Sequence, residues 1–355
     1  MSRALRTLAS PGVAAGLAAA ALFGAGTPLA KLLLTADVSP WLLAGLLYCG
    51  SGVGLLAYRL ATGRPRVRPA ASEWGWIAGA VGLGGVLGPV LLMAGLASMP
   101  ASGASLLLNA EGVFTAVIAW VVFRENVDRR VALGMLAIVA GAAVLSLGDA
   151  SGVALGAGPG PLLILGACLC WGLDNNLTRR VSLTDATWLA MVKGLVAGPT
   201  NLVLAAAAGA SWPGPGQLAG ALAIGLASYG VSLVLFIVAL REVGAARAGA
   251  YFGTGPFVGA ALAVALGEPL TWQLGVAGAL MAAGVALHLT ERHEHVHTHA
   301  ALEHTHLHRH DAHHQHAHDQ PIAPGVWHTH PHRHEPVTHA HPHTPDAHHR
   351  HRHTP

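Results

Sequence analysis

LFGAGTPLAK (22–31) and CWGLDNNLTR (170–179) are two copies of one pattern, and their separation decides the fold. The alignment matches Gly24 with Gly172 and ends each copy on a basic residue. Self-similarity at such a distance indicates a chain built from two related halves.

The sequence around both copies is almost continuously apolar. Hydrophobic residues make up 53% of the chain and charged residues only 10%, about half the charge of a soluble domain. This composition excludes a soluble fold for the first 290 residues, because their surface would need far more polar cover. The 45 glycines suit helices that pack closely in a bilayer. We therefore expect an all-α integral membrane protein.

Ten segments are long enough to cross a hydrocarbon core about 30 Å thick, which takes roughly 20 helical residues. They lie at 11–34, 39–59, 73–97, 101–123, 131–148, 160–178, 186–209, 216–240, 245–266 and 270–289. The sequence thus predicts ten transmembrane helices, five in each of two repeats.

The two predicted repeats are residues 11–148 and 160–289. A second repeated motif supports this division, because FRENV (123–127) after the fourth span matches LGEPL (266–270) after the ninth. Five spans is an odd number, so the second repeat enters the membrane from the opposite side. Inverted repeats of this kind build a site near the bilayer midplane and expose it to each side in turn.

Arginine placement predicts the orientation of the spans. With the N-terminus inside, the outer connections contain no Lys or Arg: 35–38, 98–100, 149–159, 210–215 and 267–269. The inner connections hold Arg3, Arg6, Arg59, Arg64, Arg66, Arg68, Arg124, Arg129, Arg130, Arg179, Arg180, Arg241 and Arg247. The positive-inside rule then places both termini in the cytoplasm of a multi-pass protein of the cell (inner) membrane.

Four stretches of the chain carry a family resemblance: FGAGTPLAK (23–31), GLASMPASGASLLLNAEGVFTAVIAWVVFRE (95–125), CWGLDNNLTR (170–179) and ALREVGAARAGAYFGTGPFVGAALAVALGE (239–268). They resemble the drug/metabolite transporter superfamily, in its EamA-type branch of two five-helix repeats. The resemblance covers about residues 11–289 and implies a carrier of small solutes without specifying which solute. The family commonly has a proline in its kinked fourth and ninth helices. Pro256 matches that pattern in the second half, whereas Glu111 stands at the matching place in the first.

Glu111 is the sharpest candidate for the transport pathway. It follows Asn109 and precedes Gly112, in a helix that we expect to be broken there. A break frees backbone groups for a binding site. A carboxylate at this depth suits proton coupling or direct cation binding, since burial penalises its charged form. A structural ion pair with Lys193 is the alternative.

Further polar residues fall inside the predicted spans, where a charge costs at least roughly 2.5–3.5 kcal/mol without a partner or a wet cavity. Asp174 and Asn175 lie near the middle of the sixth span and are expected to line the cavity, and Lys193 is a further pathway candidate. Lys31 lies near the outer end of its helix, where its ammonium can extend to the interface.

Residues 291–355 form a separate, soluble arm that contains 23 of the 24 histidines. The arm is poor in large apolar residues and has seven prolines from Pro321 onward, so we expect a disordered cytoplasmic tail. Neutral imidazoles bind divalent transition metals such as nickel, cobalt and zinc. The candidate ligands are His293, His295, His297, His299, His304, His306, His308, His310, His313, His314, His316, His318, His328, His330, His332 and His334.

The tail has a competing use as a pH sensor. Leaving histidine aside, its charge is −2, and protonation of all 23 histidines would raise it to +21. Mild acidification would then drive the tail to the anionic inner leaflet.

Three functions follow from these patterns. The first is a secondary transporter, working without ATP, that exports a small solute or a divalent transition metal and carries a metal-binding tail. The second is a metabolite exporter whose tail only senses or buffers metal or pH. The third is a membrane-anchored metal store without transport. The spans contain no catalytic constellation, so we expect no enzyme, no required cofactor and no nucleic-acid partner. The expected partners are the lipid bilayer, the solute or metal-ion substrate and a second copy in a homodimer.

Overall fold

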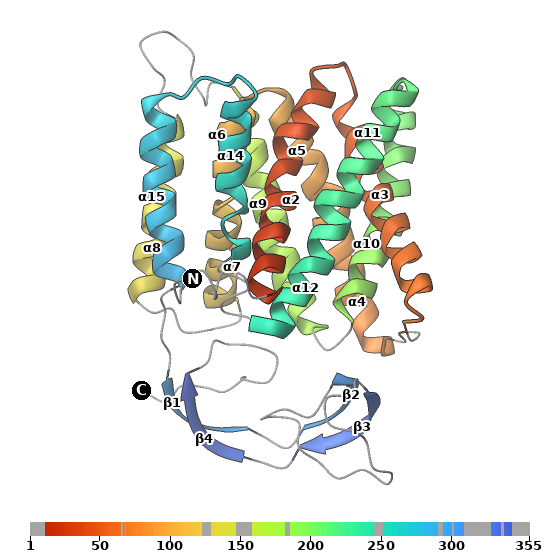
Figure 1. The fold of residues 1–355 in the computed structure, drawn as a ribbon, viewed down its shortest axis with the longest axis vertical. Coiled ribbons are helices and arrows are strands. Elements are labelled where there is room, and N and C mark those ends of the chain that lie inside the picture. The colour runs from red at the N-terminus through yellow and green to blue at the C-terminus, as the bar shows by residue number, and fades with distance from the viewer. Residues whose placement is uncertain are drawn as a thin grey trace. The chain divides into compact units, whose positions relative to one another are not determined.

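The structure is a computed structural model, in which a helical body and a separate histidine-rich tail are two units (Figure 1). It describes residues 11–64, 67, 69–122, 129–146, 158–181, 185–243, 251–289, 294–299, 302–308, 328–334 and 337–342. The first copy of the second repeated motif, FRENV at 123–127, lies outside these residues.

The first half of the body is helical. Its elements are α2 (Pro11–Leu34), α3 (Pro40–Ala61), η1 (Ala71–Glu73), α4 (Trp74–Ala80), the π-helix η2 (Val81–Leu87), α5 (Gly88–Ala97), α6 (Ala101–Leu107), α7 (Ala110–Val121) and α8 (Arg129–Ser146). Proline starts α3, where its missing N–H leaves no helical bond unmade.

The second half follows the same order. Its elements are α9 (Gly160–Arg180), α10 (Ala186–Ala207), α11 (Pro215–Gly225), the π-helix η3 (Leu226–Val231), α12 (Ser232–Val243), α14 (Gly255–Ala265) and α15 (Trp272–Leu289). Gly209 follows α10 with φ 75° and Gly267 follows α14 with φ 107°, a backbone region that glycine enters without strain.

Six stretches of the described helices are long and apolar enough to cross a membrane, and Gly255–Ala265 and Trp272–Leu287 are shorter apolar helices. The six are Pro11–Leu34, Pro40–Ala61, Ala71–Ala97, Ala101–Val121, Thr187–Ala207 and Pro215–Ala239. The body is therefore a multi-pass membrane protein, and the number of ten crossings stays a prediction.

The two halves share their irregularities as well as their helix order. A π-helix divides the third span of each half: η2 lies between α4 and α5, and η3 lies between α11 and α12. A turn at Leu108–Asn109 separates α6 from α7, and a turn at Gly253–Thr254 precedes α14. The predicted break beside Asn109 is present, and its counterpart lies just before Pro256.

The halves interlock through their first helices. Helix α2 packs against α12 and α14 of the second half, and α9 packs against α5 and α7 of the first. The remaining major contacts also cross between halves, because α3 packs on α10 and α8 on α15. The protein is therefore one body in which each half completes the core of the other.

Glycine makes the closest of these crossings possible. A Cβ placed on Gly24 of α2 would lie 2.1 Å from the Gly255 carbonyl oxygen of α14. The matching Gly172 of α9 faces α7, where a Cβ would lie 2.9 Å from Phe114 Cβ. The residues that the sequence repeat aligned thus perform the same packing task in both halves.

The tail differs from the expected disorder in four stretches. Strands β1 (Glu294–His299) and β4 (Val337–Pro342) form one antiparallel pair, and β2 (Leu302–His308) and β3 (His328–His334) form another. The physical reason lies in the sequence, because histidines alternate with other side chains at the period of a β-strand. Pairing of two such strands also satisfies backbone groups that a lone strand leaves open.

Candidate functional site

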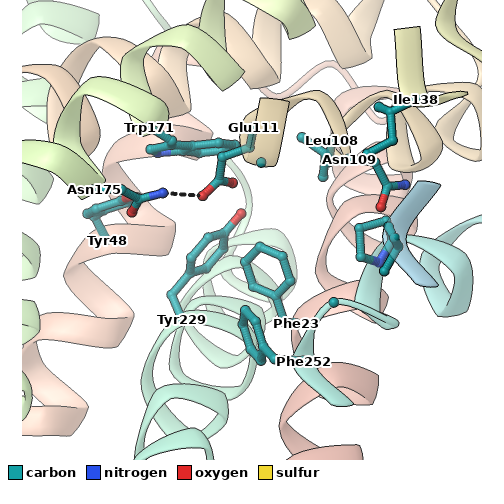
Figure 2. Close-up of a pocket in the computed structure, with 14 residues that line it drawn as sticks. Phe23, Tyr48, Leu108, Asn109, Glu111, Ile138, Trp171, Asn175, Tyr229 and Phe252 are labelled. Atoms are coloured by element: carbon teal, nitrogen blue, oxygen red, sulfur yellow. Dashed lines mark hydrogen bonds between the residues drawn. The ribbon is translucent and has the colours of Figure 1, made fainter. Parts of the chain in front are cut away.

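A cavity of about 420 Å³ lies within the helical body, and both halves contribute to its wall (Figure 2). The first half supplies the broken fourth span and its neighbours, and the second supplies α9, η3, the turn before α14, and α15. The lining residues are Phe23, Tyr48, Leu108, Asn109, Glu111, Gly112, Ile138, Trp171, Asn175, Tyr229, Phe252, Gly253, Pro256 and Val285.

Glu111 is the carboxylate in this wall. It lies in the first turn of α7, directly after the break, which directs its side chain into the cavity (Figure 2). Asn175 Nδ2 donates to Glu111 Oε1 at 2.9 Å and to Thr115 Oγ1 at 3.2 Å. The Thr115 hydroxyl donates to the Glu111 carbonyl at 2.8 Å. One carboxylate oxygen is thus held by an amide from the other half.

Asn109 stabilises the break itself. Its Nδ2 donates at 2.9 Å to the carbonyl of Leu106, at the end of α6. The same carbonyl also accepts from the Asn109 backbone N–H at 3.1 Å, so the side chain adds a second hydrogen bond at the end of α6. Asn109 therefore both lines the cavity and holds the backbone conformation that places Glu111.

Aromatic rings form a continuous wall opposite these polar groups. The ring centroids of Tyr48 and Tyr229 are 5.7 Å apart, those of Tyr229 and Phe23 are 6.1 Å apart, and those of Phe23 and Phe252 are 5.0 Å apart. Figure 2 shows the Tyr229 hydroxyl pointing toward the Glu111 carboxylate.

The carbonyl of Gly84 in η2 fixes two of the rings that line the cavity. The Gly88 N–H, its ordinary helical partner, bonds to Leu83 instead, and Pro89, the next residue, has no N–H. The free oxygen accepts from Tyr48 Oη at 2.9 Å and from Trp171 Nε1 at 3.0 Å. The π-helix thus supplies an acceptor that an α-helix would have consumed, as π-bulges at functional sites often do.

Asp174 and Lys193 form an ion pair outside the cavity wall. Lys193 Nζ lies 2.6 Å from each carboxylate oxygen of Asp174. Thr178 Oγ1 donates to Asp174 Oδ1 at 2.9 Å. The pair packs against η2 so closely that a Cβ on Gly84 would lie 2.0 Å from Asp174 Oδ2.

A second pair of charged residues holds the turn between α5 and α6. Lys31 Nζ donates to the carbonyls of Leu96 and Ala97 at 2.7 and 3.2 Å, at the C-terminal end of α5. Glu268 accepts from the N–H groups of Ala101 and Ser102 at 2.7 and 2.8 Å, at the N-terminal end of α6. Both charges complement the helix dipoles that they cap. Lys31 therefore caps the C-terminal end of α5, and its place near the membrane interface stays a prediction.

Three of the five residues predicted for the pathway lie together in the cavity wall: Asn109, Glu111 and Asn175. Asp174 and Lys193 are not in that wall, because they neutralise each other behind it. The transport role of all five stays a prediction.

Four aromatic residues of the lining were not predicted from the sequence: Phe23, Tyr48, Trp171 and Phe252. One signal existed for two of them, because the repeat alignment that matches Gly24 with Gly172 also matches Phe23 with Trp171. Both of these aromatic residues line the cavity. An aromatic side chain thus stands at the same place of both repeats and faces the same cavity.

Among the residues that the structure describes, no group of three His, Cys, Asp or Glu side chains is placed to hold a metal ion. Among the predicted tail ligands, His293, His310, His313, His314, His316 and His318 lie outside the described residues. The other ten lie in β1, β2 and β3.

Comparisons with known proteins agree with this architecture. Residues 10–147 and 158–290 each match the family described as the EamA-like transporter family. An uncharacterized transporter of Methanothermobacter thermautotrophicus is 33% identical over 205 residues, which cover 56% of this chain and 60% of that protein.

A solved crystal structure shares the fold with a TM-score of 0.57 at 20% identity, and the match covers 78% of this chain and 95% of the other. The two family matches leave between them only the short connection between α8 and α9. The chain therefore belongs to the EamA-like transporter family, with one family repeat in each half.

Proposed function

We propose that this protein is a secondary transporter that carries a small solute through the cavity between its two halves. The single observation that supports this most is the position of Glu111, a carboxylate just after a helix break in a cavity lined by both halves. A membrane anchor or a metal store needs neither the broken helices nor the cavity.

The proposed mechanism is alternating access between two inverted five-helix repeats with ten crossings in all. The recurrence of the π-helix and of the helix break in each half supports it, because inverted repeats give each half the same part to move. In this proposal both termini lie in the cytoplasm, the protein resides in the cell inner membrane as a homodimer, and transport is outward. A proton or solute gradient drives it.

The cavity favours an organic solute over a metal ion as cargo. Its described wall offers one carboxylate, two amides and several aromatic rings, and it contains neither His nor Cys. Nickel, cobalt and zinc prefer imidazole and thiolate ligands. A divalent metal stays the alternative cargo, and the flux measurements described next include it.

Flux measurements on the purified full-length chain test the transport proposal. Solutes that raise its melting temperature in detergent would be loaded into proteoliposomes, with nickel, cobalt and zinc as separate arms. Glu111→Gln should reduce flux of a stabilising solute at least about tenfold, the loss expected for a group that binds charge directly. The matched control is Glu73→Gln, which changes a carboxylate that caps η1 by accepting from Ala70 N–H.

Flux equal to that of protein-free liposomes for every stabilising solute would overturn the transport proposal. Metal flux that depends on Glu111 would replace the organic solute by the metal alternative.

A second function, metal binding by the tail, is favoured by the strand register. Three histidine pairs lie directly opposite each other between β2 and β3: His304 with His332, His306 with His330 and His308 with His328. Strands β1 and β4 place His295 opposite His341 and His297 opposite His339. Successive pairs two residues apart share one face of a ladder. No such group is assembled among the described residues, so the proposal requires a metal ion to draw four imidazoles from two neighbouring pairs around itself.

Calorimetry with nickel, cobalt and zinc on the full chain and on a chain ending at Thr290 tests this second proposal. Removal of the tail should abolish high-affinity binding while the body keeps its melting temperature. Equal metal binding by both chains would contradict it. Acid-dependent binding of the full chain to anionic vesicles, without metal binding, would support the pH-sensor alternative.

A further inference from the structure

Glu111 has no described cationic partner, whereas its neighbour Asp174 does. Among the residues that the structure describes, the ion pair beside the cavity joins Lys193 to Asp174, and none is formed by Glu111. Asn175 donates to Oε1 of Glu111 through a neutral amide. The paired charges cancel, so the described polar cluster contributes one uncompensated carboxylate to the cavity. A charged carboxylate in a membrane interior is costly without a partner or a wet cavity, and a cationic ligand would supply such a partner.

The aromatic wall also favours a positively charged ligand, as the Glu111 carboxylate does. A cation within about 6 Å of a ring centroid is attracted by the negative face of the ring. Phe23, Tyr48, Trp171, Tyr229 and Phe252 bring five such rings to one cavity. The polar atoms of Tyr48 and Trp171 are already engaged by the Gly84 carbonyl, so their rings remain as the surfaces offered to a ligand.

The size of the cavity argues for a ligand with an organic body. About 420 Å³ falls within the range of roughly 300–1,000 Å³ typical of small-molecule sites. A bare divalent ion would fill little of this space and would find one carboxylate in the described wall, where oxygen-binding cations require six or more oxygens. Leu108, Ile138 and Val285 add apolar surface for carbon substituents.

From this combination we infer that the cavity binds a monovalent organic cation, an amine or quaternary ammonium that carries an apolar or aromatic group. The charged nitrogen lies against the Glu111 carboxylate and the ring of Tyr229. The apolar group lies among Phe23, Phe252 and the aliphatic lining. The inference rests on the proposed transport function, because it names the class of solute that the same cavity carries.

Three probes that share one ring but differ in charge test the solute class by binding alone. They are benzyltrimethylammonium as the cation, benzyl alcohol as the neutral compound and phenylacetate as the anion. Isothermal titration of the purified full-length chain should give binding of the cation at least about tenfold tighter than of the other two, the factor expected from a desolvated cation–π and carboxylate site. Equal or tighter binding of benzyl alcohol or phenylacetate would overturn the inference.

Variants separate the two parts of the proposed site. Glu111→Gln should weaken binding of benzyltrimethylammonium at least about tenfold, and Tyr229→Leu should weaken it about tenfold more than Tyr229→Phe, which keeps a ring. Glu73→Gln, remote from the cavity, is the matched carboxylate control and should leave binding unchanged. Melting temperatures within a few degrees of the parent would exclude unfolding as the cause. Loss of binding in Tyr229→Phe as large as in Tyr229→Leu would contradict the role of the ring.

Proteoliposome flux then distinguishes the two proposals from each other. Binding of the cation without any flux would overturn the transporter proposal and leave the cation site standing. Flux of phenylacetate or benzyl alcohol that is indifferent to Glu111→Gln would leave the transporter standing and overturn the cation site. Glu111-dependent flux of benzyltrimethylammonium would support both.

Discussion

Lys193 lies 2.6 Å from both carboxylate oxygens of Asp174, across the two helices α9 and α10. This two-point contact neutralises both charges outside the described cavity wall, and the role of the two residues in transport stays a prediction. The contact also explains how α9 tolerates an acidic residue whose side chain is only 9% exposed, beside a lysine that is 17% exposed.

Removing one member of this pair should destabilise the protein strongly. Asp174→Asn leaves a largely buried ammonium without its partner, which costs about 3–5 kcal/mol. The double variant Asp174→Asn with Lys193→Met should recover most of that loss, because no unpaired charge remains. Unfolding free energies in mixed micelles measure both. A single variant as stable as the parent would contradict the structural role of the pair.

Gly84→Ala should be harmful where its neighbour Gly82→Ala is tolerated. A Cβ on Gly84 would lie 2.0 Å from Asp174 Oδ2, whereas one on Gly82 meets nothing within 4 Å. Both positions lie in η2, so their backbone preferences are matched. We expect Gly84→Ala to lower the free energy of unfolding by about 2–3 kcal/mol through overpacking. Equal stability of the two variants would show that η2 can shift away from Asp174.

Glu268→Ala should loosen the turn between α5 and α6. Loss of a capping side chain costs about 0.5–2 kcal/mol, and Glu268→Gln should cost less because its amide oxygen still accepts one of the two N–H groups. A thiol placed at the buried Met99 of this turn reports the opening. Its labelling by a membrane-impermeant reagent should rise in the order parent, Glu268→Gln, Glu268→Ala. Labelling that does not differ among the three would contradict the proposed role of Glu268 in holding this turn.

Gly24→Ala should prevent the halves from packing. Its Cβ would lie 2.1 Å from a backbone oxygen, which cannot turn aside as a side chain could. We expect a loss of at least about 3 kcal/mol or failure to accumulate in the membrane. Gly75→Ala is the matched control, since a Cβ there meets nothing within 4 Å. Normal accumulation and stability of Gly24→Ala would show that α2 and α14 can separate without cost.

Much of the fold could be predicted because it depends on patterns that survive along the chain. Apolar runs of span length, the repeated Gly24 and Gly172, and the polar interruption at Asn109 each have a direct structural counterpart. The structure of the tail was harder to predict than that of the body, since composition predicted disorder while the two-residue period of its histidines favoured strands. Composition and periodicity compete there, and in four stretches the structure follows periodicity.

The site was only partly predictable, for a physical reason. In a helix that is apolar all round, the sequence does not indicate which face meets lipid and which meets a cavity. Glu111, Asn109 and Asn175 were recognisable because polar groups are costly in lipid wherever they point. Phe23, Tyr48 and Phe252 suit lipid as well as a cavity, so their place depended on the packing of the two halves. The pairing of Asp174 with Lys193 likewise depends on the packing of both α9 and α10 against η2, which no spacing along the chain encodes.

Pro89 has a consequence that extends beyond its own helix. Pro89 has no N–H to donate to the Gly84 carbonyl. That oxygen therefore accepts from Tyr48 of the first half and from Trp171 of the second. The distance between these two rings is therefore set by a residue outside the cavity wall. Replacement of that one proline would change the shape of the cavity while every residue of its wall stays as it is.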